Sequence, residues 1–342
     1  MIRRTSLIAA LTALALTAVL AAGCGGTSDA SGNSGSGGGG TIDLVAYSTP
    51  EVVYDKLIPM FQKTDAGSGV NFTESYGGSG DQSRAVVAGQ PADYVHFAIA
   101  PDIDRLVDSG LVDSSWADNE HKGIVSESVV VFVVRKGNPK NIQTWEDLVK
   151  PDVEVITPNP FSSGGARWNI MAAYGAMRHE GKTDAEAINY LSELFQHVPV
   201  QDDKASAALQ TFVGGKGDVL ISYENEAILA QDNGEPVDYV IPDSTMLIET
   251  PAAVVSGGDD ADAAQKFLDF VYKPEAQKIF AETGYRPVDG RVLEQYKQKF
   301  PEPEDLFTIE DVGGWDEVTT KFFDPDDSVM QKIESELGVS IE

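Results

Sequence analysis

Short apolar runs alternate with longer amphipathic segments along the chain from residue 41 onward. Residues 42–47, 95–99 and 128–134 are rich in β-branched and aromatic residues, which predicts strands. Apolar residues recur at helical spacing between and after these runs, which predicts helices over residues 167–179, 184–195, 206–212, 261–272 and 275–282. Strands that alternate with helices are typical of α/β proteins built on largely parallel sheets. The pattern therefore predicts an α/β body.

The first forty residues follow a different pattern. Two arginines precede an apolar run over residues 7–20 and then small residues, which is the order of a secretory signal peptide over residues 1–23. The apolar run is shorter than the ~20 residues of a membrane span. Residues 24–40 then consist mostly of glycine and serine, a composition that predicts a flexible tether.

Cys24 is the only cysteine of the chain. It follows Ala21-Ala22-Gly23, and this segment resembles a bacterial lipobox, although leucine is usual three places before the cysteine. The resemblance implies a lipid on Cys24 and a protein anchored at the outer face of the cell membrane. The alternative is a secreted protein with a single thiol.

Composition limits the classes of partner. The chain has 342 residues, a length that suggests about two domains, and its formal net charge is −29. Such acidity argues against nucleic acid or an anionic membrane surface as a partner, because both require a basic surface. Four histidines that are not grouped with the cysteine offer little for a zinc site, so neither a metal nor another cofactor is predicted.

Small residues directly precede a predicted helix at three places, in segments 76–84, 162–168 and 203–209. A helix N-terminus carries backbone N–H groups without partners and about half a positive charge, so it can bind an oxyanion without a cationic side chain. Glycine allows the backbone to approach a ligand closely, and serine adds a hydroxyl donor. The alternative is that these residues are ordinary helix caps.

Six segments together carry a family resemblance. They are similar to motifs of the sulfate/thiosulfate-binding proteins of ABC importers, in order along the chain: Tyr76–Gln82, Asn138–Ile142, Trp145–Leu148, Val155–Pro160, Ser162–Asn169 and Gly217–Glu226. The resemblance implies a two-lobed, periplasmic-binding-protein-like fold. Each lobe is a mainly parallel sheet flanked by helices, and one divalent anion binds in the cleft between the lobes.

The resemblance also implies the division of the body into lobes. Residues 41–123 and 241–290 are expected to form the first lobe, and residues 124–240 the second. Residues 291–342 are expected to form a C-terminal helical segment that packs on the lobes. A monomer is expected.

The family's ligand contacts carry over to particular positions of this sequence. The resemblance assigns contacts to the backbone N–H groups of Ser79, Gly164, Gly165 and Ala205, and to both the N–H and the hydroxyl of Ser163. A family tryptophan corresponds to Tyr223, whose phenol donates a hydrogen bond but can also accept one. Ser48 is expected at the edge of the cleft, although residues 47–51 depart from the usual family motif.

A pocket of donors selects sulfate for a physical reason. Sulfate carries no proton at neutral pH, whereas hydrogenphosphate has an O–H that needs an acceptor or stays unsatisfied at a cost of ~1–3 kcal/mol. Asp81 and Tyr223 could supply such an acceptor, and we expect Asp81 instead to face solvent beside the helix N-terminus. Arg84 and Arg167 are expected either to orient or shield the site or to be surface or ion-paired residues.

The predicted function is capture of sulfate, or of thiosulfate, and its delivery to ABC permease subunits with a cytoplasmic ATPase. Phosphate, molybdate and tungstate are alternative ligands. A serine ester hydrolase is a further alternative, but Gly77–Asp81 lacks the last glycine of a nucleophile elbow. No catalytic residue is therefore assigned, and Trp145, Trp168 and Trp315 are expected in the core.

Overall fold

The computed structural model describes residues 40–258 and 260–339. The predicted signal peptide, Cys24 and the predicted tether up to residue 39 lie outside the described residues. Across the described ranges, no helix is both long enough and apolar enough to cross a bilayer.

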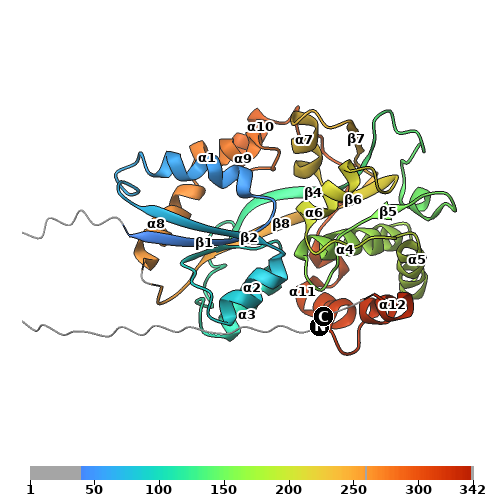
Figure 1. Ribbon diagram of the computed structural model, residues 1–342, viewed down its shortest axis with the longest axis horizontal. Helices are drawn as coiled ribbons and strands as arrows, with labels where there is room; N and C mark the ends of the chain where they lie inside the picture. The colour runs from blue at the N-terminus through green and yellow to red at the C-terminus, as the bar shows by residue number, and fades with distance from the viewer. Residues whose placement is uncertain (1–39, 259, 340–342) are drawn as a thin grey trace, which may run out of the picture. The chain divides into compact units, whose positions relative to one another are not determined.

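The first lobe begins with the alternation of strands and helices that the sequence predicts. Its strands are parallel, with β1 between the other two: β1 (Thr41–Tyr47), β2 (Asn71–Gly77) and β3 (Tyr94–His96). Its helices are α1 (Glu51–Phe61), α2 (Ser79–Val87), α3 (Ala100–Asp108), α8 (Ala261–Val271), α9 (Pro274–Glu282) and α10 (Gly290–Gln295). Apolar residues of α1, α8 and α9 share one core cluster with β1, while those of α2 and α3 belong to another. Figure 1 shows these two groups of helices on opposite faces of the strands.

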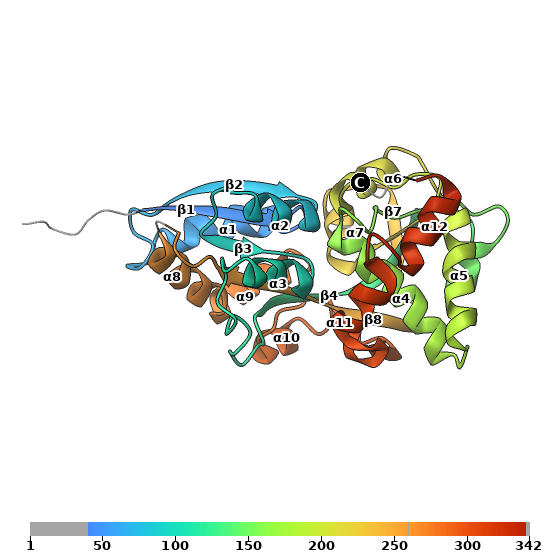
Figure 2. The ribbon, with the colours of Figure 1, turned by 90° about the horizontal axis from the view of Figure 1, so that it is seen from below.

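Two long strands connect the lobes. They are β4 (Ile124–Arg135) and β8 (Ser244–Val254), which pair with each other in the antiparallel direction. Beyond this shared stretch, β8 pairs with β3, and β4 pairs with β6 (Val219–Tyr223) and β7 (Val237–Val240). With β5 (Val155–Ile156) at its end, the strand order β2-β1-β3-β8-β4-β6-β5 therefore continues from one lobe into the other. Figure 2 shows β4 and β8 passing between the two lobes.

The second lobe surrounds α4. Its first elements are η1 (Trp145–Val149), β5 (Val155–Ile156), α4 (Gly164–His179), α5 (Asp184–Gln196), α6 (Ala205–Val213), β6 (Val219–Tyr223), α7 (Glu224–Asp232) and β7 (Val237–Val240). The chain ends with β9 (Asp305–Phe307), η2 (Ile309–Val312), α11 (Gly314–Val318), η3 (Thr319–Phe323) and α12 (Val329–Leu337). Phe322 and Met330 of this last segment share a core cluster with Leu191 and Leu194 of α5, so the segment packs on the second lobe.

The sheet is mixed, which refines the prediction of mainly parallel sheets. The parallel pairs are β1–β2, β1–β3, β5–β6 and β8–β9. All pairings between β3, β8, β4, β6 and β7 are antiparallel. The long strands β4 and β8 produce this result because they cross between the lobes in opposite directions. In the first lobe β8 runs antiparallel to β3, and in the second lobe β4 runs antiparallel to β6 and β7.

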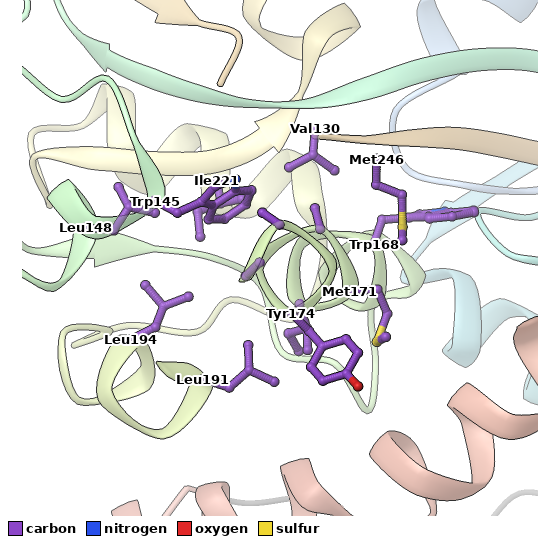
Figure 3. Close-up of a cluster of buried hydrophobic side chains, with 14 of the residues drawn as sticks. Val130, Trp145, Leu148, Trp168, Met171, Tyr174, Leu191, Leu194, Ile221 and Met246 are labelled. Atoms are coloured by element: carbon purple, nitrogen blue, oxygen red, sulfur yellow. The ribbon is translucent and has the colours of Figure 1, made fainter. Parts of the chain in front are cut away.

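The largest core cluster lies in the second lobe (Figure 3). Trp145 and Trp168 are fully buried in it, and Trp315 packs against it with its ring edge-on to Trp168. The prediction of a core position is therefore confirmed for Trp145 and Trp168, whereas Trp315 is only partly buried. Thr144 and Asp147 form a capping box at the start of the short 3₁₀ helix η1.

Candidate functional site

The three glycine- and serine-rich junctions lie around one small cavity between the lobes. Helices α2, α4 and α6 begin at Ser79, Gly164 and Ala205, so the junctions are their N-termini. The cavity is small, because the centre of a water-sized sphere can move through only about 10 Å³ of it. It is lined by Tyr47, Ser48, Gly77, Gly78, Ser79, Ala98, Ser163, Gly165, Lys204, Ala205 and Tyr223. Segments far apart in the sequence thus contribute to the same space.

The first N–H groups of these helices are available for a ligand. No hydrogen bond within the described part of the chain uses the backbone N–H of Ser79, Gly164, Gly165 or Ala205. The first N–H groups of a helix have no partner inside it, and the helix dipole adds a positive potential at the same place. The cavity therefore has the electrostatic character of an anion site.

Ser163 corrects one sequence-based expectation. Its N–H donates to the carbonyl oxygen of Asn159 at 2.9 Å, because residues 159–163 form a turn that leads into α4. This N–H is therefore already used in the structure, whereas the Ser163 hydroxyl makes no side-chain cap bond to its helix. The side chain of Ser163, rather than its N–H, is the group that can serve a ligand.

Gly165 lies where three lining residues meet. A Cβ atom added at this position would lie 3.4 Å from Ser163 Oγ and 3.5 Å from both Ala205 Cβ and Tyr223 Oη. A side chain at Gly165 would therefore occupy the cavity. Glycine leaves this space open and allows its own N–H to face a ligand.

Gly164 has a different role, because it is absent from the cavity lining. A Cβ at Gly164 would lie 2.9 Å from Ala98 Cβ and 3.1 Å from Ser79 Cβ. Gly164 begins α4 of the second lobe, whereas Ser79 and Ala98 belong to the first. The missing side chain therefore permits close approach of the two lobes.

Tyr223 presents a buried hydroxyl without a partner. Its Oη makes no hydrogen bond to the described residues, and the residue is 1% exposed. Burial raises the pKa of Tyr223 well above its ordinary value, so the phenol keeps its proton. An unpaired buried donor is costly, and a bound acceptor would satisfy it.

Ser48 lies at the end of β1, against the N-terminus of α6. Its Oγ accepts a long hydrogen bond of 3.4 Å from the N–H of Ser206, the second residue of that helix. Ser48 lines both the small cavity and a second cavity beside it. Ser48 therefore remains a candidate ligand contact that lines both cavities.

The charged residues that raised questions in the sequence lie outside this cavity. Asp81 forms an ion pair with Arg84, both are about half exposed, and neither is in the lining. Arg167 is 7% exposed, donates from Nε to Pro160 O at 2.9 Å and lies over the ring of Phe323. Burial lowers the pKa of Arg167 to about 10. Arg84 is therefore a surface ion-paired residue, and Arg167 orients the loop that precedes α4.

Sequence reasoning missed two residues beside the site. Lys204 is the N-cap of α6 and the only charged residue in the cavity lining among the described residues. Asp102 is 1% exposed and binds the side chain of Ser79. Nothing in the local sequence marks Asp102, because an acidic residue in the first turn of a helix is common.

Several hydrogen bonds hold the lobes together around the cavity. The N–H of Gly80 donates to Ser162 O at 3.1 Å, and the Trp168 indole donates to Ala98 O at 2.7 Å. Arg84 also donates to the carbonyl of Phe161 at 3.2 Å. Residues of the two lobes are therefore joined by hydrogen bonds in this structure.

Comparisons with known proteins agree with this geometry. Residues 42–286 match the family model described as bacterial extracellular solute-binding protein. The chain is 40% identical over 291 residues to the sulfate-binding protein of Synechococcus elongatus, covering 82% of this chain and 83% of that protein. It is 36% identical over 293 residues to the thiosulfate-binding protein of Pseudomonas aeruginosa, covering 82% of this chain and 88% of the relative.

A solved structure is also similar. The sulfate-binding protein SubI from Mycobacterium tuberculosis superimposes with a TM-score of 0.81 at 47% identity, covering 83% of this chain and 99% of SubI. The two-lobed α/β fold, the motifs around the cavity and these matches lead to one conclusion. The chain belongs to the family of bacterial extracellular solute-binding proteins.

Proposed function

We propose that this protein captures sulfate outside the cytoplasm and delivers it to an ABC permease that works with a cytoplasmic ATPase. The observation that supports the ligand is the convergence of the N-termini of α2, α4 and α6 on one small cavity. Unpaired N–H groups and helix dipoles stabilise a dianion by direct contact. The similarity to proteins named for sulfate supports the same choice.

Selectivity follows from the donors of the proposed site. Among the residues that the structure describes, none in the cavity lining carries a carboxylate, and Asp81 lies outside the lining in an ion pair. The O–H of hydrogenphosphate would have to compete for the few hydroxyl oxygens of the lining. An unsatisfied O–H costs ~1–3 kcal/mol, which corresponds to a preference for sulfate of roughly 5-fold to more than 100-fold.

Thiosulfate is the second candidate ligand. A relative of this chain is named for thiosulfate, and the anion carries the same charge as sulfate. Its terminal sulfur is larger than an oxygen and a weaker hydrogen-bond acceptor. In so small a cavity with donors on several sides, we therefore expect thiosulfate to bind more weakly than sulfate.

Binding without covalent chemistry is the activity we propose. The hydroxyl of Ser79 is committed to Asp102. His96 lies in the core, where its ring nitrogens contact Tyr54 and Thr250 rather than a serine of the cavity. Turnover of a sulfate or phosphate ester that disappears in Ser79→Ala or Ser163→Ala would instead establish a hydrolase.

Isothermal titration of the mature body with sulfate, thiosulfate, hydrogenphosphate and molybdate tests the proposed function. We expect one site per chain, with sulfate bound more tightly than hydrogenphosphate. Equal affinity for hydrogenphosphate and sulfate would contradict the proposal, and so would the absence of heat with sulfate. Gly165→Leu is a matched negative control, because its side chain would fill the cavity next to Tyr223 Oη.

Capture is proposed to proceed by closure of two lobes, residues 41–123 with 241–290 and residues 124–240. The crossing strands β4 and β8 support this division, and residues 291–339 support it by packing on the second lobe. The bonds from Gly80 to Ser162 and from Trp168 to Ala98 join the two lobes. We propose that a monomer performs this cycle.

Attachment to the membrane through a lipid on Cys24 is a separate part of the proposal. The residues around Cys24 support it by their resemblance to a lipobox. Cys24→Ser should release the protein from membranes into the soluble fraction. Retention of that variant by membranes would contradict the lipoprotein proposal without affecting the proposed ligand.

A further inference from the structure

Asp102 lies in the first turn of α3, directly behind the N-terminus of α2. Its side chain is 1% exposed, and Oδ2 accepts the hydroxyl proton of Ser79 at 2.6 Å. Oδ1 pairs with the Arg105 guanidinium at 2.7 Å. Asp102 does not line the cavity, so any effect on a ligand must pass through Ser79.

The hydroxyl of Ser79 is fixed by its neighbours. Its proton is donated to Asp102, and its oxygen accepts the N–H of Ala98 at 2.9 Å. A serine hydroxyl has one donor and two lone pairs, so the donor and one lone pair are used. This hydroxyl therefore cannot rotate toward the cavity without breaking a buried hydrogen bond.

The acceptor that fixes Ser79 is itself held in place. Arg105 also donates to Ser83 Oγ at 2.7 Å, and Ser83 Oγ donates to the backbone oxygen of Asp102 at 2.7 Å. These bonds connect α2 with α3. These bonds fix the orientation of the Asp102 carboxylate. Its Oδ2 atom in turn fixes the direction in which the Ser79 hydroxyl donates its hydrogen bond.

We propose that Asp102 is a positioning residue that determines oxyanion specificity by holding the Ser79 hydroxyl away from the ligand. This inference rests on the proposed function. With the hydroxyl and its one remaining lone pair held in this orientation, Ser79 offers the ligand its backbone N–H, which can only donate. If the hydroxyl were released, its oxygen could accept the O–H of hydrogenphosphate and remove the penalty that disfavours this anion.

The experiment measures the ratio of the dissociation constants for hydrogenphosphate and sulfate, at a mildly alkaline pH where phosphate is mainly the dianion. In Asp102→Ala we expect this ratio to fall by roughly 5-fold to more than 100-fold. Removal of a buried negative charge changes the affinity for both dianions in the same direction. The ratio therefore isolates the hydrogen-bonding effect from the effect of charge.

Ser79→Ala separates the proposed positioning role of Asp102 from a purely structural role. Alone, this variant should keep the wild-type ratio of the two dissociation constants, because the backbone N–H of residue 79 remains. Combined with Asp102→Ala, it should restore the ratio, because no hydroxyl is left to accept the phosphate proton. In Asp102→Asn the remaining oxygen is expected to face Arg105, so the amide donates to Ser79 Oγ and the ratio should change little.

Each outcome has a clear consequence. An unchanged ratio in Asp102→Ala overturns the inference, and so does a fallen ratio that Ser79→Ala does not restore. If Asp102→Ala does not fold, the double variant D102L/R105M replaces the ion pair by apolar side chains and removes the same acceptor. Absence of sulfate binding in the wild type would refute the proposed function, whereas sulfate binding with an unaltered ratio would refute this inference alone.

Discussion

Gly164→Ala should weaken sulfate binding by opposing closure of the lobes. The added Cβ would lie 2.9 Å from Ala98 Cβ and 3.1 Å from Ser79 Cβ. Carbon atoms in contact are normally about 3.5–4.0 Å apart, so the two surfaces must separate by roughly 0.5–1 Å. Both facing atoms are Cβ atoms, which side-chain rotation cannot move away.

The expected cost can be converted to affinity. Overpacking of this kind costs about 1–3 kcal/mol, which corresponds to a dissociation constant raised about 5-fold to more than 100-fold. The penalty applies to the closed arrangement, because Gly164 and the two residues it faces belong to different lobes. The free protein should keep its melting temperature or gain slightly, since alanine favours a helix more than glycine does.

Calorimetric titration with sulfate and thermal unfolding of the free protein provide the two readouts. Gly290→Ala is the matched control, because Gly290 is also the first residue of a helix but has no atom within 4 Å of an added Cβ. Wild-type affinity in Gly164→Ala would refute the reasoning. An equal loss of affinity in Gly290→Ala would show that the effect does not arise at the interface of the lobes.

Three further predictions concern charge and pH. Burial lowers the pKa of His96 to about 3, so the free energy of unfolding should fall as pH decreases from about 6.5 toward 3. In His96→Gln, denaturant titrations should show a smaller decrease in the free energy of unfolding over the same pH range than in the wild type. Burial raises the pKa of Glu226 to about 7, so the free energy of unfolding should fall as pH rises from about 4.5 through 7. Relative to wild type, the free energy of unfolding of Glu226→Gln should increase by up to about 3 kcal/mol across this interval. The same pH dependence of unfolding in the variant and the wild type would contradict the assignment. The net charge of −29 should slow encounter with a dianion, so stopped-flow association with sulfate should become faster as inert salt is added, whereas slower association would show that local positive potential dominates.

Much of the site could be predicted because its chemistry resides in short local motifs. Segments 76–84 and 162–168 combine glycine, serine and the start of a helix within a few residues, and such junctions can be identified without a fold. Their convergence could not be derived from spacing, since Ser79 and Gly164 are brought together only by the crossing of β4 and β8. The family resemblance supplied that step.

The remaining features depend on contacts between distant segments. The bond from Ser79 to Asp102 spans 23 positions, and an aspartate in a first turn has no distinctive local signal. The N–H of Ser163 donates to the carbonyl oxygen of Asn159 in a turn over residues 159–163. The sequence of these residues alone does not predict the geometry of that turn. The antiparallel pairs of β4 and β8 were missed for a similar reason, because the apolar pattern of a buried strand does not encode its direction.

Crystals grown with selenate, a tetrahedral dianion whose selenium can be located by anomalous scattering, would show where the anion binds. We expect one selenium peak inside the small cavity, with oxygens within hydrogen-bonding distance of the N–H groups of Gly165 and Ala205 and of the Tyr223 hydroxyl. A peak outside this cavity, or coordination dominated by arginine and lysine side chains, would contradict this expectation.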